Sequence, residues 1–257
     1  MKWSRLFQRK PSIPSYVLYE EREVDDYHKF PLGMADDAEI SWDIRYCPHL
    51  LVTGGSGSGK TVLQRNLIRH TADYSEKWDT IVLDMESFYD VSQAEGQGYT
   101  FYEQDQLEEF IDHVAQETKK REALISEPYE AQDVGEESQT PYGKELLIVI
   151  TEANELFSSP SYVDKFTVLL NKSQRLGIHF ALIVYDFKPS EDDEDSPLKD
   201  IFEDNVVVCG NHFGMPVEQM KSFELAHNVT PVGRACYYRS GVGKAFQMFF
   251  TDPHQQA

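Results

Sequence analysis

The sequence has few cysteines, no long apolar run and a shortage of positive charge. Among its 257 residues are three cysteines, Cys47, Cys209 and Cys236, whose odd number and wide spacing argue against a disulfide framework or a cysteine-based metal site. No apolar stretch approaches the roughly 18–20 residues that cross a bilayer, so we expect no direct membrane insertion. The basic N-terminus lacks the apolar core of a signal peptide. We therefore expect a cytoplasmic protein.

Acidic residues outnumber basic ones by 44 to 24, which gives a formal net charge of −20. Such a balance opposes indiscriminate binding to nucleic acid or to anionic membranes, although it is compatible with a local basic surface. The 15 Phe, 14 Tyr and 3 Trp exclude a largely disordered chain. The length suits one large α/β domain or two small ones.

Two regions differ in their sequence patterns. Residues 1–30 change from basic to acidic, and we interpret them as an N-terminal arm that is either flexible or docks on a partner or on DNA phosphates. Residues 31–257 form the predicted folded domain. Strands are predicted at 49–53, 80–84, 146–150, 179–184 and 206–209, helices after the first of these and at 105–126 and 161–175, a surface loop at 127–144, and a closing hairpin at 235–238 and 246–250. This alternation predicts a parallel α/β sheet.

A glycine-rich segment is the clearest functional signal. It matches the phosphate-binding loop pattern G-x-x-x-x-G-K-[ST] and consists of Gly54, Gly55, Ser56, Gly57, Ser58, Gly59, Lys60 and Thr61. The predicted strand before it and the predicted helix after it are the setting that the motif requires. Glycines let backbone N–H groups turn towards a phosphate, and the helix N-terminus adds its positive dipole. The sequence therefore predicts ATP binding, with Lys60 on the β- and γ-phosphates and Thr61 on Mg²⁺.

Phosphate-binding loops work together with a second strand that ends in acidic residues. The best candidate is the apolar run 146–150, which is followed by Thr151 and Glu152. The acid expected to hold Mg²⁺ is thus replaced by Thr151, whose hydroxyl, or a water, would orient the ion. Glu152 occupies the position of the base that polarises the attacking water. Asp84, which ends another predicted strand, is either a further acid near the phosphates or a cap for the next segment.

These segments, in this order, resemble the FtsK/SpoIIIE-type ATPases of the FtsK–HerA superfamily, in particular the short versions carried by phages and mobile elements. The resemblance rests on the sequence Pro-His-Leu-Leu-Val-Thr-Gly at 48–54 and on the loop and helix at 57–67. Later landmarks agree: the strand that ends in Asp84, the segment leading to Glu152, Gly-Ile-His-Phe-Ala-Leu at 177–182, and Val-Gly-Arg-Ala at 232–235 before the hairpin. The resemblance covers roughly residues 31–250.

The resemblance implies a RecA-like P-loop fold, with a mainly parallel sheet flanked by helices and a C-terminal hairpin. It also implies ATP and Mg²⁺ as cofactors and assembly of copies of the chain into a ring, a hexamer in the family manner. Double-stranded DNA would then be a partner of the assembled ring. Lys60 and Glu152 are the expected catalytic residues within one subunit.

Several family positions depart from the pattern. The family sequence Asp-x-Lys is here Asp84-Met85-Glu86, which removes a cation, and the Thr-Gln-Arg-Pro that senses the γ-phosphate is replaced at 184–189. The Arg expected three residues before the Gly177 position is Gln174, with Arg175 one position away. Arg175 is therefore the candidate for an arginine finger that acts in trans on a neighbouring subunit.

Three functional hypotheses follow. The leading one is an ATPase motor that translocates double-stranded DNA, with partly degenerate acidic and sensor motifs and weak hydrolysis. The second is a hydrolysis-poor, nucleotide-binding structural or regulatory subunit, which the change to Thr151 favours. The third is an ATPase module like those of type VII secretion systems, which would move protein.

Overall fold

Within the described residues, ten strands form one mixed sheet. The computed structural model describes residues 13–14, 16–23, 25–36, 38–86, 98–126, 141–157, 159–173, 175–185, 205–210, 233–239 and 242–250. The strand order across the sheet is β2-β1-β10-β9-β8-β3-β7-β6-β4-β5. The basic beginning of the predicted arm, Gln174, residues 186–189 and most of the predicted 127–144 loop lie outside the described residues.

Six neighbouring strands of this sheet are parallel. They are β8 (Asn205–Cys209), β3 (Leu50–Thr53), β7 (Ile178–Val184), β6 (Glu145–Thr151), β4 (Trp78–Asp84) and β5 (Thr100–Glu103). Because they run the same way, their C-terminal ends meet at one edge of the sheet. This edge carries the glycine-rich loop, Asp84 and Thr151, which brings the predicted functional residues to one place.

The remaining four strands are antiparallel and extend the sheet beyond β8. They are β9 (Arg234–Arg239), β10 (Val242–Met248), β1 (Lys29–Ala35) and β2 (Ala38–Asp43). The predicted closing hairpin is confirmed, but β10 begins earlier than expected because Val242–Lys244 pair with the end of β9 despite their weak apolar pattern. β1 begins at Lys29, so the sheet includes the last residues of the segment assigned to the arm.

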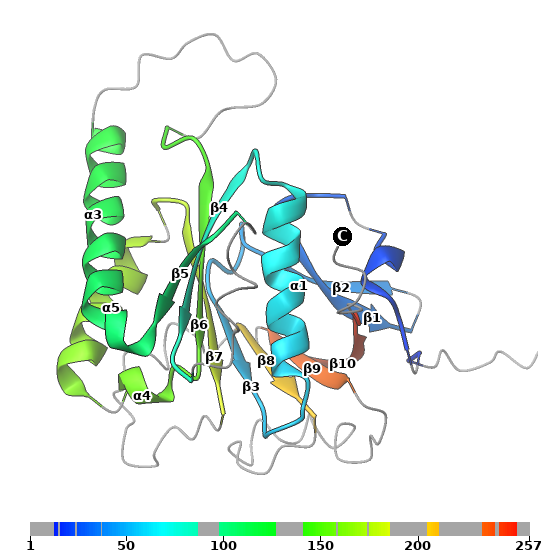
Figure 1. Ribbon diagram of the computed structural model, residues 1–257. Helices are drawn as coiled ribbons and strands as arrows, with labels where there is room; N and C mark the ends of the chain where they lie inside the picture. The colour runs from blue at the N-terminus through cyan, green and yellow to red at the C-terminus, as the bar shows by residue number, and fades with distance from the viewer. Residues whose placement is uncertain are drawn as a thin grey trace, which may run out of the picture.

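Helices cover both faces of the sheet (Figure 1). The long helix α1 (Lys60–Asp73) lies on one face, and α3 (Leu107–Ser126), α4 (Asn154–Phe157) and α5 (Pro160–Ser173) lie on the other. Two short 3₁₀ turns, η1 (Tyr19–Glu21) and η2 (Gln104–Gln106), complete the described elements. The three-layer arrangement confirms the expected mainly parallel sheet flanked by helices.

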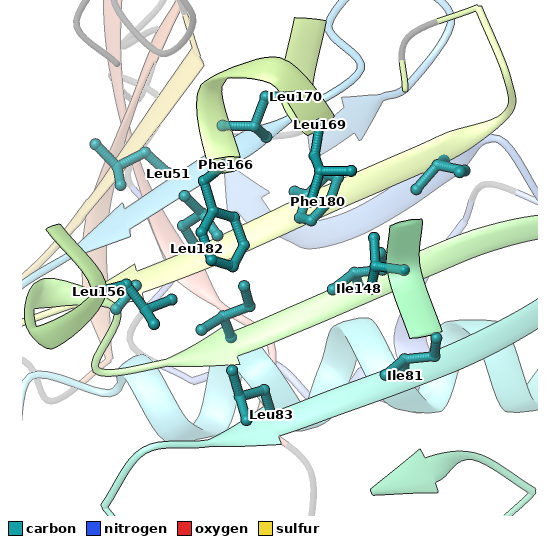
Figure 2. Packing of buried hydrophobic residues seen from close by; sticks show 14 of the residues in the cluster. Leu51, Ile81, Leu83, Ile148, Leu156, Phe166, Leu169, Leu170, Phe180 and Leu182 are labelled. Atoms are coloured by element: carbon teal, nitrogen blue, oxygen red, sulfur yellow. The ribbon is translucent and has the colours of Figure 1, made fainter. Parts of the chain in front are cut away.

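Side chains of the central strands alternate between two hydrophobic cores. On β6, Ile148 and Ile150 face the α3 and α5 layer, whereas Leu147 and Val149 face the α1 layer. Figure 2 shows the first core, in which Phe166 and Leu170 of α5 pack against side chains of the central strands. Burial on both faces explains why these strands read as continuous apolar runs rather than alternating ones. No helix among the described residues is long and apolar enough to cross a membrane.

Candidate functional site

The glycine-rich loop lies between the C-terminal end of β3 and the first turn of α1, as the motif requires. Gly59 has φ +103°, in the left-handed region, and a Cβ there would clash with the side chain of Met248 on β10. Glycine at this position therefore satisfies both the backbone conformation and the close approach of β10. The loop opens onto the C-terminal edge of the parallel strands.

Lys60 begins α1, and its side chain curls back over the loop. Its Nζ donates to the carbonyl oxygen of Gly54 at 2.6 Å and to that of Gly55 at 3.3 Å, and lies 3.6 Å from Oε1 of Glu152. The residue is only 8% exposed. The buried ammonium group is thus held at the mouth of the loop by two neutral carbonyl oxygens and one carboxylate. Phosphate oxygens of a bound nucleotide could replace these contacts.

Glu152 follows β6 in a conformation that is unusual for a non-glycine residue. Its φ of +43° lies in the left-handed region, which is a strained conformation for such a side chain. Burial raises the pKa of its carboxyl, while Lys60 and the backbone N–H of Tyr185 act in the opposite direction. The strained turn brings this carboxylate to Lys60, and a raised pKa suits a group that accepts a proton.

Thr151 is held by neighbours from β4. Its Oγ1 donates to Oδ1 of Asp84 at 2.8 Å and accepts from the backbone N–H of Met85 at 3.1 Å. Oδ1 of Asp84 also accepts from the backbone N–H of Glu86 at 3.2 Å, while the segment that it would cap lies outside the described residues. Both Thr151 and Asp84 are buried.

A cavity of about 370 Å³ opens beside the loop, within the ~300–1,000 Å³ range of small-molecule sites. Its lining includes Ser56, Gly57, Lys60, Thr61, Gln64, Asp84, Glu86, Thr151, Glu152, Ile183 and Tyr185. The hydroxyl of Thr61 and the carboxylates supply oxygen donors, the ligand type that Mg²⁺ prefers. The side chains at this cavity therefore fit both a phosphate group and its magnesium ion.

Arg175 is not part of this cavity. It lies exposed in the turn between α5 and β7, at the opposite edge of the sheet, roughly 20 Å away along β7 at ~3.3 Å per residue. The next two residues of the turn are fixed, because Nη1 of Arg121 donates to the carbonyl oxygens of Leu176 and Gly177 at 3.0 and 2.9 Å. Arg175 is thus exposed and lies far from the cavity of its own chain.

Two cavity residues received no role from the sequence. Tyr185 is half exposed, and its ring centroid lies 5.1 Å from Nζ of Lys60. Gln64 is 3% exposed, and its Nε2 has no hydrogen-bond partner within the described part of the chain. The spacing of Gln64 four residues after Lys60 places both on one face of α1, which is the signal that could have found it.

No protein-family model matches the sequence, and a search of curated proteins gives no significant match. Solved structures do match. The conjugation coupling protein TcpA of pCW3, in a monomer form with ATPγS, has a TM-score of 0.72 at 19% identity over 95% of this chain and 72% of its own. At this identity the match shows a shared fold, and the expected RecA-like fold is thereby confirmed.

Other structures share this RecA-like fold. The cytoplasmic domain of the type VII secretion ATPase EccC from Thermomonospora curvata has a TM-score of 0.70 at 16% identity, over 93% of this chain but only 28% of its own. The DNA-packaging ATPase B204 of Sulfolobus Turreted Icosahedral Virus has a TM-score of 0.52 at 12% identity, over 79% and 98%. The chain therefore spans most of TcpA and B204 but less than a third of EccC.

Proposed function

We propose that this protein is a cytoplasmic, ATP-binding motor ATPase that hydrolyses ATP with Mg²⁺ and translocates double-stranded DNA. The observation that supports this most is the convergence of Lys60, Thr61 and Glu152 on one cavity at the C-terminal edge of the parallel strands. Lys60 would meet the β- and γ-phosphates, and Glu152 would polarise the attacking water. Bound Mg²⁺ would neutralise charge on the phosphates.

Assembly into a homo-oligomeric ring, a hexamer in the family manner, is part of the proposal. Arg175 lies at the opposite sheet edge from the cavity of its own subunit, on a turn held by Arg121. An arginine finger in trans needs an exposed guanidinium such as that of Arg175, and it adds charge that stabilises the transferring phosphate. The neighbour's loop would then be its target.

DNA binding is expected only in the assembled state. A net charge of −20 repels a polyanion over most of an isolated subunit. A ring would have to concentrate a few cations and backbone N–H groups in its channel. Binding should therefore depend on ATP, be insensitive to sequence and weaken strongly with salt.

A second candidate function is a hydrolysis-poor structural or regulatory subunit. It is favoured by Thr151 at the position of an acid, with its hydroxyl hydrogen-bonded to Asp84. Nucleotide would then bind without efficient turnover, because positioning and charge neutralisation supply most of the catalysis in phosphoryl transfer.

ATP turnover with and without double-stranded DNA separates these functions, with oligomeric state measured on the same samples. DNA binding is followed by anisotropy at low and moderate salt, with and without a non-hydrolysable ATP analogue. Stimulated turnover and analogue-dependent, salt-sensitive binding support the motor. Nucleotide binding without turnover supports the structural or regulatory subunit. ATP turnover by an oligomer that never binds DNA would instead support an ATPase that moves protein.

A further inference from the structure

We propose that Asp84 supplies the acidic group for the magnesium ion that β6 lacks, and that Thr151 positions it. The assignment rests on the proposed nucleotide site, because an ion is expected there only with bound phosphate. It moves the acid by one strand, from the end of β6 to the end of β4. The ligand is a divalent cation of the Mg²⁺ type, bound with the nucleotide.

Strand register brings the two residues together. β4 and β6 are parallel neighbours, and Asp84 is the register partner of Thr151 at the edge that carries the glycine-rich loop. The backbones at the two positions are therefore about 4.8 Å apart, the spacing of neighbouring strands. Moving the carboxylate across to β4 keeps it at the same cavity, which Asp84 lines together with Thr61.

The hydrogen bonds of Thr151 indicate a positioning role. Its hydroxyl donates to Oδ1 of Asp84 at 2.8 Å, with the carbonyl oxygen of Leu83 as a more distant acceptor at 3.4 Å, and it accepts from the backbone N–H of Met85. The hydroxyl is thereby committed to holding the carboxylate of Asp84 and the start of the next segment. A carboxylate is also a far better partner than a neutral hydroxyl for a divalent cation or for the waters that surround it.

A second observation points to a ligand in the same cavity. Nε2 of Gln64 is buried without a hydrogen-bond partner among the described residues, and the residue lines the cavity together with Asp84. An unpaired buried amide donor costs free energy, so the arrangement is explained by an acceptor that arrives with the ligand, such as a phosphate oxygen or a water. The unpaired donor of Gln64 therefore supports a phosphate in the cavity that Asp84 lines.

The test measures metal binding rather than turnover. Mn²⁺ is titrated into protein saturated with ADP, and bound ion is followed by electron paramagnetic resonance. We expect Asp84→Asn to weaken Mn²⁺ binding by roughly 10- to 100-fold. Thr151→Val, which keeps the acid and the side-chain volume but removes the positioning hydrogen bond, should weaken it by less than Asp84→Asn does, by about tenfold. The matched control is Asp79→Asn, on the same strand but at its other end, where Asp79 is exposed and pairs with Lys144 at 3.1 Å; it should change nothing.

Unchanged Mn²⁺ affinity in folded Asp84→Asn overturns the proposal. So does a loss in Thr151→Val that equals or exceeds the loss in Asp84→Asn, because that would make the hydroxyl itself the ligand. If circular dichroism shows that Asp84→Asn does not fold, Asp84→Ser takes its place and is judged by the same two outcomes. ADP binding in the presence of Mg²⁺ is measured first: its absence in the wild type contradicts the proposed function, whereas ADP binding with Mn²⁺ affinity indifferent to Asp84 contradicts only the assignment of the acid.

Discussion

Replacing Glu152 by Gln separates the chemistry of the site from its binding. At 3.6 Å, the attraction between Lys60 and Glu152 is about 4–5 kcal/mol for an effective dielectric constant of about 20, before the cost of burial is subtracted. Burial nevertheless raises the pKa of Glu152 against the effect of Lys60, so desolvation outweighs this attraction. Glu152→Gln should therefore leave the melting temperature unchanged or raise it, and leave ATP affinity unchanged or tighten it.

Turnover should respond in the opposite way. A positioned general base contributes typically ~10²–10⁴-fold, so Glu152→Gln should lower kcat by at least about 100-fold. Because the raised pKa keeps the carboxyl protonated to higher pH, activity should increase as pH rises through that pKa, above the ordinary value of about 4.3. In Glu152→Gln, the residual activity should not fall at low pH in this way, because glutamine does not titrate.

Phosphate release across a pH series gives kcat and its dependence on pH, and ATP titration by calorimetry gives the ATP affinity. Wild-type turnover in Glu152→Gln would refute the role of this carboxylate. A fall in turnover matched by an equal fall in ATP affinity would refute the separation of chemistry from binding.

Two further predictions concern buried polar groups. Burial lowers the pKa of His49 to about 3 and of His70 to about 4, from about 6.5, so both remain neutral in the folded protein and their contribution to stability is lost as pH falls below about 6.5. Lowering the pH from 7.5 to 5.5 should cost about 3 kcal/mol, or roughly 6–12 °C in melting temperature, and a melting temperature that rises instead would contradict this. Gln64→Met removes the unpaired amide and should raise the melting temperature of the nucleotide-free protein by roughly 2–4 °C; a decrease would mean that the amide is satisfied.

The central part of the fold was predictable because its sequence signals are local. The glycine-rich motif requires a strand before it and a helix after it. Apolar runs such as 146–150 are too short for a buried helix and indicate strands that are buried on both faces. The position of Glu152 followed from its place directly after such a run. Its left-handed backbone had no signal in the sequence, because only the surrounding structure imposes that conformation.

Strands β1, β2 and β5 were not predicted. β1 contains Pro31 and Gly33, residues that argue against a strand, and its register with β2 shifts between them. Gly33 is needed there because a Cβ would clash with the backbone of Gln247 on β10. The contact between Asp84 and Thr151 was equally hidden, since it depends on which strands are neighbours and on their register.

ATP affinity measured by calorimetry, for the wild type and Lys60→Ala, tests the central claim most directly. Lys60 is the charge placed to meet the β- and γ-phosphates, so its removal should weaken binding at least tenfold. Lys77→Ala, in the turn after α1, is the control and should bind as the wild type does. Equal ATP affinity in the wild type and Lys60→Ala would contradict nucleotide binding at the glycine-rich loop.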